Sequence, residues 1–134
     1  MFGFPVWIGV DWGKCRDIPS GTLDPVMFKE HDAMLNLKTM SKGEMLESCA
    51  SKMTHAVCIV GIDKDNKEET RYRIENSHGN KGIGGFYHAS ESYLRLFMYQ
   101  AAIMSSLLPR EISDLFAQTA IELKPWDPMG ALAK

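Results

Sequence analysis

Two short stretches decide the fold: THAVCIVGI at residues 54–62 and TRYRIEN at residues 70–76. The first is a run of β-branched and small apolar residues, which is typical of a buried strand. The second alternates Tyr72, Ile74 and Asn76 with charged residues, so it predicts a strand with one wet face. Between them, Asp-Asn at residues 65–66 can occupy the positive-φ positions of a tight turn. The two stretches therefore predict an antiparallel hairpin.

The predicted hairpin brings a histidine beside an asparagine. A two-residue turn would place Ile59 opposite Tyr72 and His55 opposite Asn76, although a longer loop would shift this register. Opposed side chains lie within about 5.5 Å at Cβ, close enough for an imidazole to hydrogen-bond a carboxamide. A histidine held by an asparagine is the orienting half of a Cys-His-Asn hydrolase. The alternative is a structural histidine with a satisfied hydrogen bond.

The other segments predict short elements and no internal repeat. Strands are expected at residues 4–10, 86–89 and 98–104, the last as a core strand, and helices at residues 26–37, 41–49, 91–97 and 109–118. Ser41 with Glu44 three residues later resembles a capping box, which would open the second of these helices. Residues 15–25, rich in proline and glycine, predict a loop. A core strand opening at residue 4 favours a chain that is the later part of something longer.

Composition indicates one globular domain, or a piece of one. The 134 residues are 45% hydrophobic and 24% charged, enough for a core without metals or disulfides. A net charge of −2 with no basic block disfavours nucleic-acid binding, and no segment is apolar enough to span a membrane. Three cysteines without C-x-x-C spacing favour reduced thiols in a cytoplasmic setting. No metal or other cofactor is expected, because the remaining histidines lack ligand spacing.

Four segments carry a family resemblance: FPVWIGVDWGK at residues 4–14, MTHA at 53–56, ENS at 75–77 and PWDPMGALAK at 125–134. Together they resemble the C-terminal portion of the bleomycin hydrolase and aminopeptidase C family, which are papain-like cysteine peptidases. The final segment is the most specific, since ordinary papain-like peptidases have no counterpart to it. The resemblance implies an α+β fold: the β-rich, His/Asn-bearing half of a papain-like peptidase, with an antiparallel sheet and flanking short helices.

The resemblance also implies roles for particular residues. His55 would be the catalytic imidazole and Asn76 its orienting amide, within residues 1–122 as the C-terminal half of the peptidase domain. Residues 123–134 would be an extended tail lying in the active-site cleft. There Ala133 and Lys134 would position substrate, because a terminal carboxylate can bind the free α-amino group of a peptide. The expected partners are such peptides, the missing Cys-bearing half and, once complete, other copies in a hexamer.

Two departures from the family pattern stand out. The family's nucleophilic cysteine, in a Gln-x-Gly-x-Cys segment, and its oxyanion-hole glutamine do not occur in these 134 residues. Cys15, Cys49 in its predicted helix, and Cys58, which would face away from His55, are interpreted as structural thiols. The chain alone is therefore expected to be inactive. The second departure is His78, where the family has a shielding Trp, which would leave the His-Asn pair wetter.

These departures keep a second hypothesis open. The chain could be a truncated product or pseudoenzyme, serving as a non-catalytic binding or assembly module. In either case, half of a two-part fold exposes the surface that packs against the other half. We therefore expect the lone chain to aggregate or to associate with partners.

Overall fold

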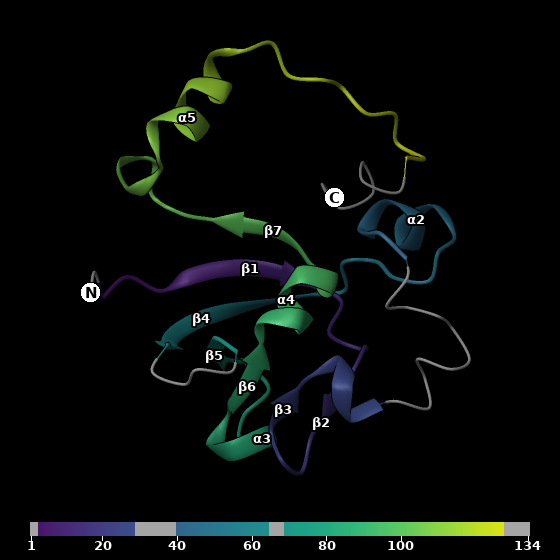
Figure 1. The fold of residues 1–134 in the computed structure, drawn as a ribbon, viewed down its shortest axis with the longest axis vertical. Coiled ribbons are helices and arrows are strands. Elements are labelled where there is room, and N and C mark those ends of the chain that lie inside the picture. The colour runs from purple at the N-terminus through teal and green to yellow at the C-terminus, as the bar shows by residue number, and fades with distance from the viewer. Residues whose placement is uncertain (1–2, 29–39, 65–68, 128–134) are drawn as a thin grey trace.

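One seven-stranded sheet organises the molecule, with strand order β2-β3-β6-β5-β4-β1-β7 (Figure 1). The computed structural model describes residues 3–28, 40–64 and 69–127. The strands are β1 (Val6–Val10), β2 (Arg16–Asp17), β3 (Thr22–Leu23), β4 (His55–Asp63), β5 (Arg71–Glu75), β6 (Phe86–Ser90) and β7 (Met98–Ala102). The predicted hairpin is thus confirmed as β4 and β5, at the centre of the sheet.

The sheet is mixed, whereas an antiparallel one was predicted. All neighbouring strands run antiparallel except β3, which lies parallel to β6. The difference arises in residues 15–25, predicted as a loop, which form β2 and β3. The His88 amide donates to the carbonyl of Gly21 at 2.7 Å, so this segment is held along β6 by backbone pairing that side-chain patterns do not report.

The register of the β4–β5 hairpin differs from the predicted one. Ile59 lies opposite Ile74, not Tyr72, and the register shifts again between Ile59 and Gly61. The physical cause is the longer connection, since Asp63 pairs with Arg71 and leaves residues 64–70 between the strands. The proposed turn at residues 65–66 lies outside the described residues. The irregularity at residue 60 is of the kind that bends a strand and increases its twist.

Short helices flank the sheet: η1 (Pro25–Phe28), α2 (Lys42–Glu47), α3 (Lys81–Gly84) and α4 (Glu91–Phe97). Further short helices follow β7: η2 (Ser105–Leu107), α5 (Arg110–Ser113) and η3 (Asp114–Ala117). The Ser41 capping box of α2 is confirmed, with both reciprocal hydrogen bonds present. Cys49 was wrongly placed inside this helix. It follows the helix end in the left-handed conformation, with φ of 56°, and its side chain is exposed. Of the predicted helix at 26–37, residues 26–28 lie in η1 and residues 29–37 lie outside the described residues.

The core forms between the central strands and α4, which lies over the sheet in Figure 1. Tyr93 and Phe97 of α4 are fully buried. From the sheet side the buried apolar members are Ile8, Val10, Leu23, Val57, Ile74, Tyr87 and Ala89, with Trp12 directly after β1. Burial of such side chains typically stabilises a fold by about 1.5–3 kcal/mol each. This core fixes β1 and β4 side by side, with Val10 opposite His55.

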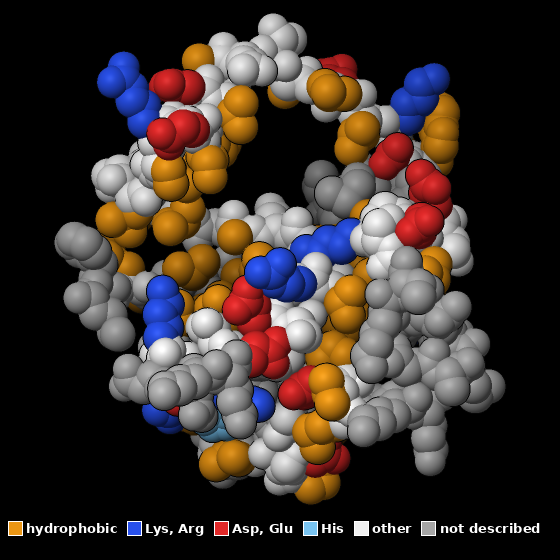
Figure 2. All heavy atoms as spheres, viewed as in Figure 1, with side chains coloured by type: hydrophobic (Ala, Val, Ile, Leu, Met, Phe, Trp, Pro, Cys, Tyr) orange, Lys and Arg blue, Asp and Glu red, His pale blue; other side chains and the backbone are white. Residues whose placement is uncertain are grey.

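The chain beyond β7 leaves the body of the protein. We call residues 103–127 the arm, and Figure 2 shows an open gap between much of it and the rest of the molecule. β7 is an edge strand with its last three residues exposed, so the predicted core strand at residues 98–104 was wrong in its burial. The predicted helix at 109–118 is divided into α5 and η3. Its apolar residues Ile112, Leu115 and Phe116 are 46%, 57% and 79% exposed.

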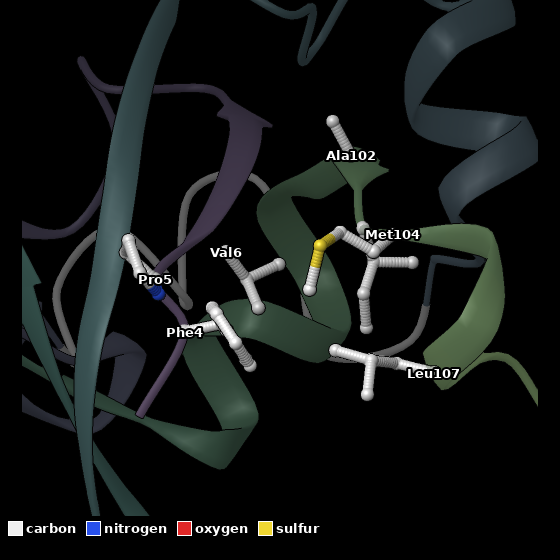
Figure 3. Close-up of a pocket in the computed structure, with 7 residues that line it drawn as sticks. Phe4, Pro5, Val6, Ala102, Met104 and Leu107 are labelled. Carbon is white, nitrogen blue, oxygen red and sulfur yellow. The ribbon is translucent and has the colours of Figure 1, made fainter. Parts of the chain in front are cut away.

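An apolar pocket of about 440 Å³ lies where the N-terminal segment meets β7 and η2 (Figure 3). Its lining residues are Phe4, Pro5, Val6, Ala102, Ile103, Met104 and Leu107. The pocket adjoins the start of β1, whereas His55 pairs with the other end of that strand. It is therefore separate from the predicted His-Asn pair. Within the described residues, no helix is both long and apolar enough to cross a membrane.

Candidate active site

The structure brings His55 and Asn76 into direct contact. His55 is the first residue of β4, and Asn76 directly follows the last residue of β5. The imidazole Nε2 lies 2.8 Å from the carboxamide Oδ1. Asn76 is buried and His55 half-buried. The backbone N–H of Asn76 also donates to the carbonyl of Gly85 at 3.1 Å, which fixes the backbone where the chain leaves β5.

A second donor to the carboxamide settles the direction of the proton. The backbone N–H of Ser77 donates to Asn76 Oδ1 at 2.9 Å, so this atom is the amide oxygen. An oxygen without a hydrogen can only accept, and Nε2 of His55 must therefore carry the hydrogen of the shared bond. In the neutral ring, that arrangement leaves Nδ1 as the nitrogen able to accept a proton. The pair thus has the polarity that a general base requires.

Two further rings contact the His55 imidazole. The His78 ring stacks on it, with centroids 4.6 Å apart and planes inclined by 22°. The Trp12 indole lies 5.5 Å away at an inclination of 53°. His78 is exposed, whereas Trp12 is only 5% exposed. The His55 ring is consequently bordered by one solvent-facing ring and one ring from the core.

A buried carboxylate lies close to this ring assembly. Asp11, 4% exposed, accepts hydrogen bonds at Oδ2 from Ser51 Oγ at 2.8 Å and from the Lys52 amide at 3.2 Å. Tyr99 donates its hydroxyl proton to Ser51 at 2.6 Å. The Tyr93 hydroxyl donates to the Asp11 carbonyl, and burial, reinforced by the Asp11 charge, raises the pKa of that phenol. The hydrogen bonds to Asp11 therefore connect the segment before Trp12 with residues 51–52, which lie shortly before His55.

Neither Asp11 nor Trp12 was predicted from the sequence as a site residue. A usable signal was present, because an acidic residue directly after an apolar strand must either turn to solvent or find partners inside. The contact between Trp12 and His55 depends on the pairing of β1 with β4, two strands far apart in sequence. That pairing cannot be read from the local pattern of either strand.

The three thiols occupy different environments. Burial, and secondarily the charge of Glu75, raises the pKa of Cys58, which favours its unreactive thiol form. Cys15 is half-buried with φ of 48°, and Cys49 is exposed. Among the described residues, no group of three or more His, Cys, Asp or Glu side chains could hold a metal ion. Ala133 and Lys134 lie outside the described residues.

Comparison with known proteins establishes the class. The model of the Peptidase C1-like family matches residues 2–130, and the chain belongs to this family. It is 36% identical over 132 residues to Aminopeptidase C of Listeria innocua serovar 6a and 34% identical over 138 residues to bleomycin hydrolase of Mus musculus. Each alignment covers 98% of this chain and 30% of the relative. The resemblance to the bleomycin hydrolase and aminopeptidase C family is thereby confirmed.

A solved structure supports the same assignment. PepW from Lactobacillus rhamnosis HN001 superposes with a TM-score of 0.80 at 37% sequence identity, over 96% of this chain and 30% of PepW. The predicted papain-like α+β class is confirmed by this match. The chain spans about 30% of the length of these relatives, so it corresponds to one part of their fold.

Proposed function

We propose that this chain supplies the histidine and asparagine of a Cys-His-Asn site in a cysteine aminopeptidase. The observation that carries the proposal is the 2.8 Å contact between His55 Nε2 and the buried Asn76 Oδ1, with the proton on Nε2. Membership of the Peptidase C1-like family and relatives named Aminopeptidase C support it. The thiol would come from a segment outside these 134 residues, since none of Cys15, Cys49 and Cys58 lies in a recognisable nucleophile motif.

The proposed chemistry is hydrolysis of a peptide or amide through a thioester. His55 accepts the thiol proton at Nδ1, and the thiolate attacks the scissile carbonyl carbon. When the tetrahedral intermediate collapses, the C–N bond breaks and His55 returns the proton to the leaving amine. His55 then removes a proton from water as the water attacks the thioester, which releases the acid and restores the thiol. Throughout, Asn76 holds the Nε2 hydrogen and thereby orients the ring.

The proposed substrates are peptides with a free N-terminus. In the family pattern the tail lies in the cleft, and its terminal carboxylate at Lys134, next to Ala133, would bind the substrate's α-amino group. Such a charge pair would restrict the enzyme to trimming from the N-terminus. We further propose a cytoplasmic location and, for the completed protein, the hexameric assembly expected from the resemblance.

An alternative is a non-catalytic binding or assembly module. The apolar side chains of the arm favour it, because Phe116, Ile121 and Trp126 are 76–88% exposed and suited to contact another protein. The His78 ring that stacks on His55 is itself exposed, which leaves the His-Asn pair open to water on that side. This hypothesis predicts association without turnover.

Complementation tests the two functions against each other. The purified chain is mixed with the Cys-bearing N-terminal part of an Aminopeptidase C relative, and hydrolysis of an aminoacyl fluorogenic amide is measured. We expect activity only in the mixture, abolished by His55→Ala and retained by His88→Ala, an exposed histidine on β6. No turnover from a complex that demonstrably forms would contradict the catalytic function and favour the alternative.

A further inference from the structure

We propose that Trp12 is a positioning residue for the His55 imidazole and that the buried Asp11 carboxylate holds it there. The inference rests on the proposed function only in taking His55 as the base. The contacts themselves belong to the described part of the chain and can be tested without turnover.

Trp12 is fixed against His55 from two sides. Its backbone N–H donates to Thr54 Oγ1 at 2.9 Å, and Thr54 is the residue immediately before His55. The Thr54 amide in turn donates to the carbonyl of Val10 at 2.9 Å. The Tyr87 ring meets the indole edge-on at a centroid distance of 4.9 Å. The indole therefore has little freedom to move relative to the imidazole 5.5 Å away.

The Asp11 carboxylate fixes the segment from which His55 emerges. Its Oδ2 accepts from Ser51 Oγ and from the Lys52 amide, and its own amide donates to the carbonyl of Phe97 at 2.9 Å. Residues 51–54 lead directly into β4, and Asp11 is the residue immediately before Trp12 in the chain. The buried Asp11 side chain thus positions two parts of the site: the Trp12 indole and the strand that begins with His55.

The asparagine alone leaves one motion of the imidazole uncontrolled. A single hydrogen bond at Nε2 does not lock the ring, because rotation about the Cβ–Cγ bond can break it. That rotation tilts Nδ1 away from a thiol and frees the ring to adopt either tautomer. Contacts on the faces of the ring oppose this rotation. The His78 face is exposed, so Trp12, which is 5% exposed, is the rigid one of the two.

The indole nitrogen distinguishes this role from simple packing. Trp12 Nε1 is buried and has no hydrogen-bond partner within the described residues. A buried donor without a partner destabilises a fold, and an apolar side chain such as Phe or Leu would avoid that cost. The size of the indole, which reaches from Tyr87 to His55, accounts for its presence despite this cost.

The test compares two tryptophans of the same segment. Trp12→Leu removes the ring beside His55, whereas Trp7→Leu removes a 60% exposed ring from β1 and serves as the matched control. In the full 134-residue chain, two-bond ¹⁵N–¹H correlations report whether neutral His55 carries its proton on Nε2 or Nδ1. Modification by diethyl pyrocarbonate, mapped by mass spectrometry, reports its accessibility, with the exposed His88 as internal reference.

In the parent chain we expect His55 to be the Nε2–H tautomer. In Trp12→Leu we expect a mixture of tautomers and a modification rate of His55 raised roughly two- to tenfold, the factor that corresponds to one lost aromatic contact. Trp7→Leu leaves both readouts unchanged. If Trp12→Leu does not fold, Thr54→Val decides, because it removes the hydroxyl that binds the Trp12 amide at nearly constant volume.

A folded Trp12→Leu or Thr54→Val chain with an unchanged tautomer and modification rate would overturn the inference. That result would leave the proposed function intact if His55→Ala still abolished activity in the complemented mixture. Conversely, a shifted tautomer in a mixture without turnover would retain Trp12 as a positioning residue and count against the peptidase function.

Discussion

At the scale of single residues, the candidate site depends on which atom carries a proton. The Ser77 amide identifies Asn76 Oδ1 as an acceptor, and this acceptor places the hydrogen of His55 on Nε2. The polarity follows from backbone and side chain together. Neither His55 nor Asn76 would establish it alone, because each can donate or accept.

Removal of the Asn76 carboxamide tests this polarity. We expect Asn76→Ala to lower the rate of the complemented mixture by about 10²-fold, since a mis-oriented imidazole loses general-base catalysis. It should also destabilise the chain by about 0.5–1.5 kcal/mol, the net contribution of a typical hydrogen bond, because the exposed Ser77 N–H exchanges Asn76 Oδ1 for water. The matched control is Asn80→Ala, an exposed asparagine whose side chain makes no cap hydrogen bond at α3. Equal rates for Asn76→Ala and the parent would argue against an orienting role.

At the scale of elements, the sequence predicted the hairpin and the α2 capping box but not the strand register. Periodicity identified β4 and β5 because apolar alternation reports which face is buried. The register depends on the residue 64–70 connection and on the irregularity between Ile59 and Gly61, which alternation does not encode. The His55–Asn76 contact was nevertheless predicted, although for an incorrect reason: Asn76 reaches the imidazole from just beyond β5, with its amide bonded to Gly85.

The link between α4 and β1 predicts a specific response to alkaline pH. Burial raises the pKa of Tyr93 above its ordinary value of 10.0, so its proton is held more tightly in the folded state than in the unfolded state. Its contribution to stability is complete below pH 10.0 and is lost as the pH rises above that value. Tyr93→Phe should lower the free energy of unfolding at pH 7 by about 0.5–1.5 kcal/mol, through loss of the bond to the Asp11 carbonyl.

Chemical denaturation at pH 7 and above pH 10 measures both effects. The stability difference between the parent and Tyr93→Phe should shrink as the pH rises, because only the parent has this phenol to ionise. The subtraction removes contributions from other groups, including Tyr99, whose pKa burial also raises. A difference that stayed constant or widened with pH would contradict the assigned role of Tyr93.

At the scale of the whole molecule, the sequence did not predict the contacts between segments that lie far apart in the chain. The family, the α+β class and the His-Asn pair were accessible from short motifs, because those motifs contain the residues concerned. Two features depend on strands that become neighbours only after folding: the parallel pairing of β3 with β6 and the position of Trp12 beside His55. The arm shows the same principle, since its apolar pattern predicted one amphipathic helix and the described chain has two short turns with exposed apolar side chains.

The exposed arm leads to the last prediction, that the isolated chain associates. Phe116 and Ile121 are 79% and 88% exposed, and apolar surface of this kind gains free energy when another surface covers it. Light scattering after size exclusion should give a mass above the 15.1 kDa of one chain, rising with concentration.

Phe116→Ser with Ile121→Ser should weaken association at least about tenfold, because each large apolar side chain contributes more than 1.4 kcal/mol on burial. Gln118→Ser with Thr119→Ser, in the same arm, is the control and should leave it unchanged. A monomer at every concentration, with one sharp and concentration-independent unfolding transition, would show that the arm requires no partner.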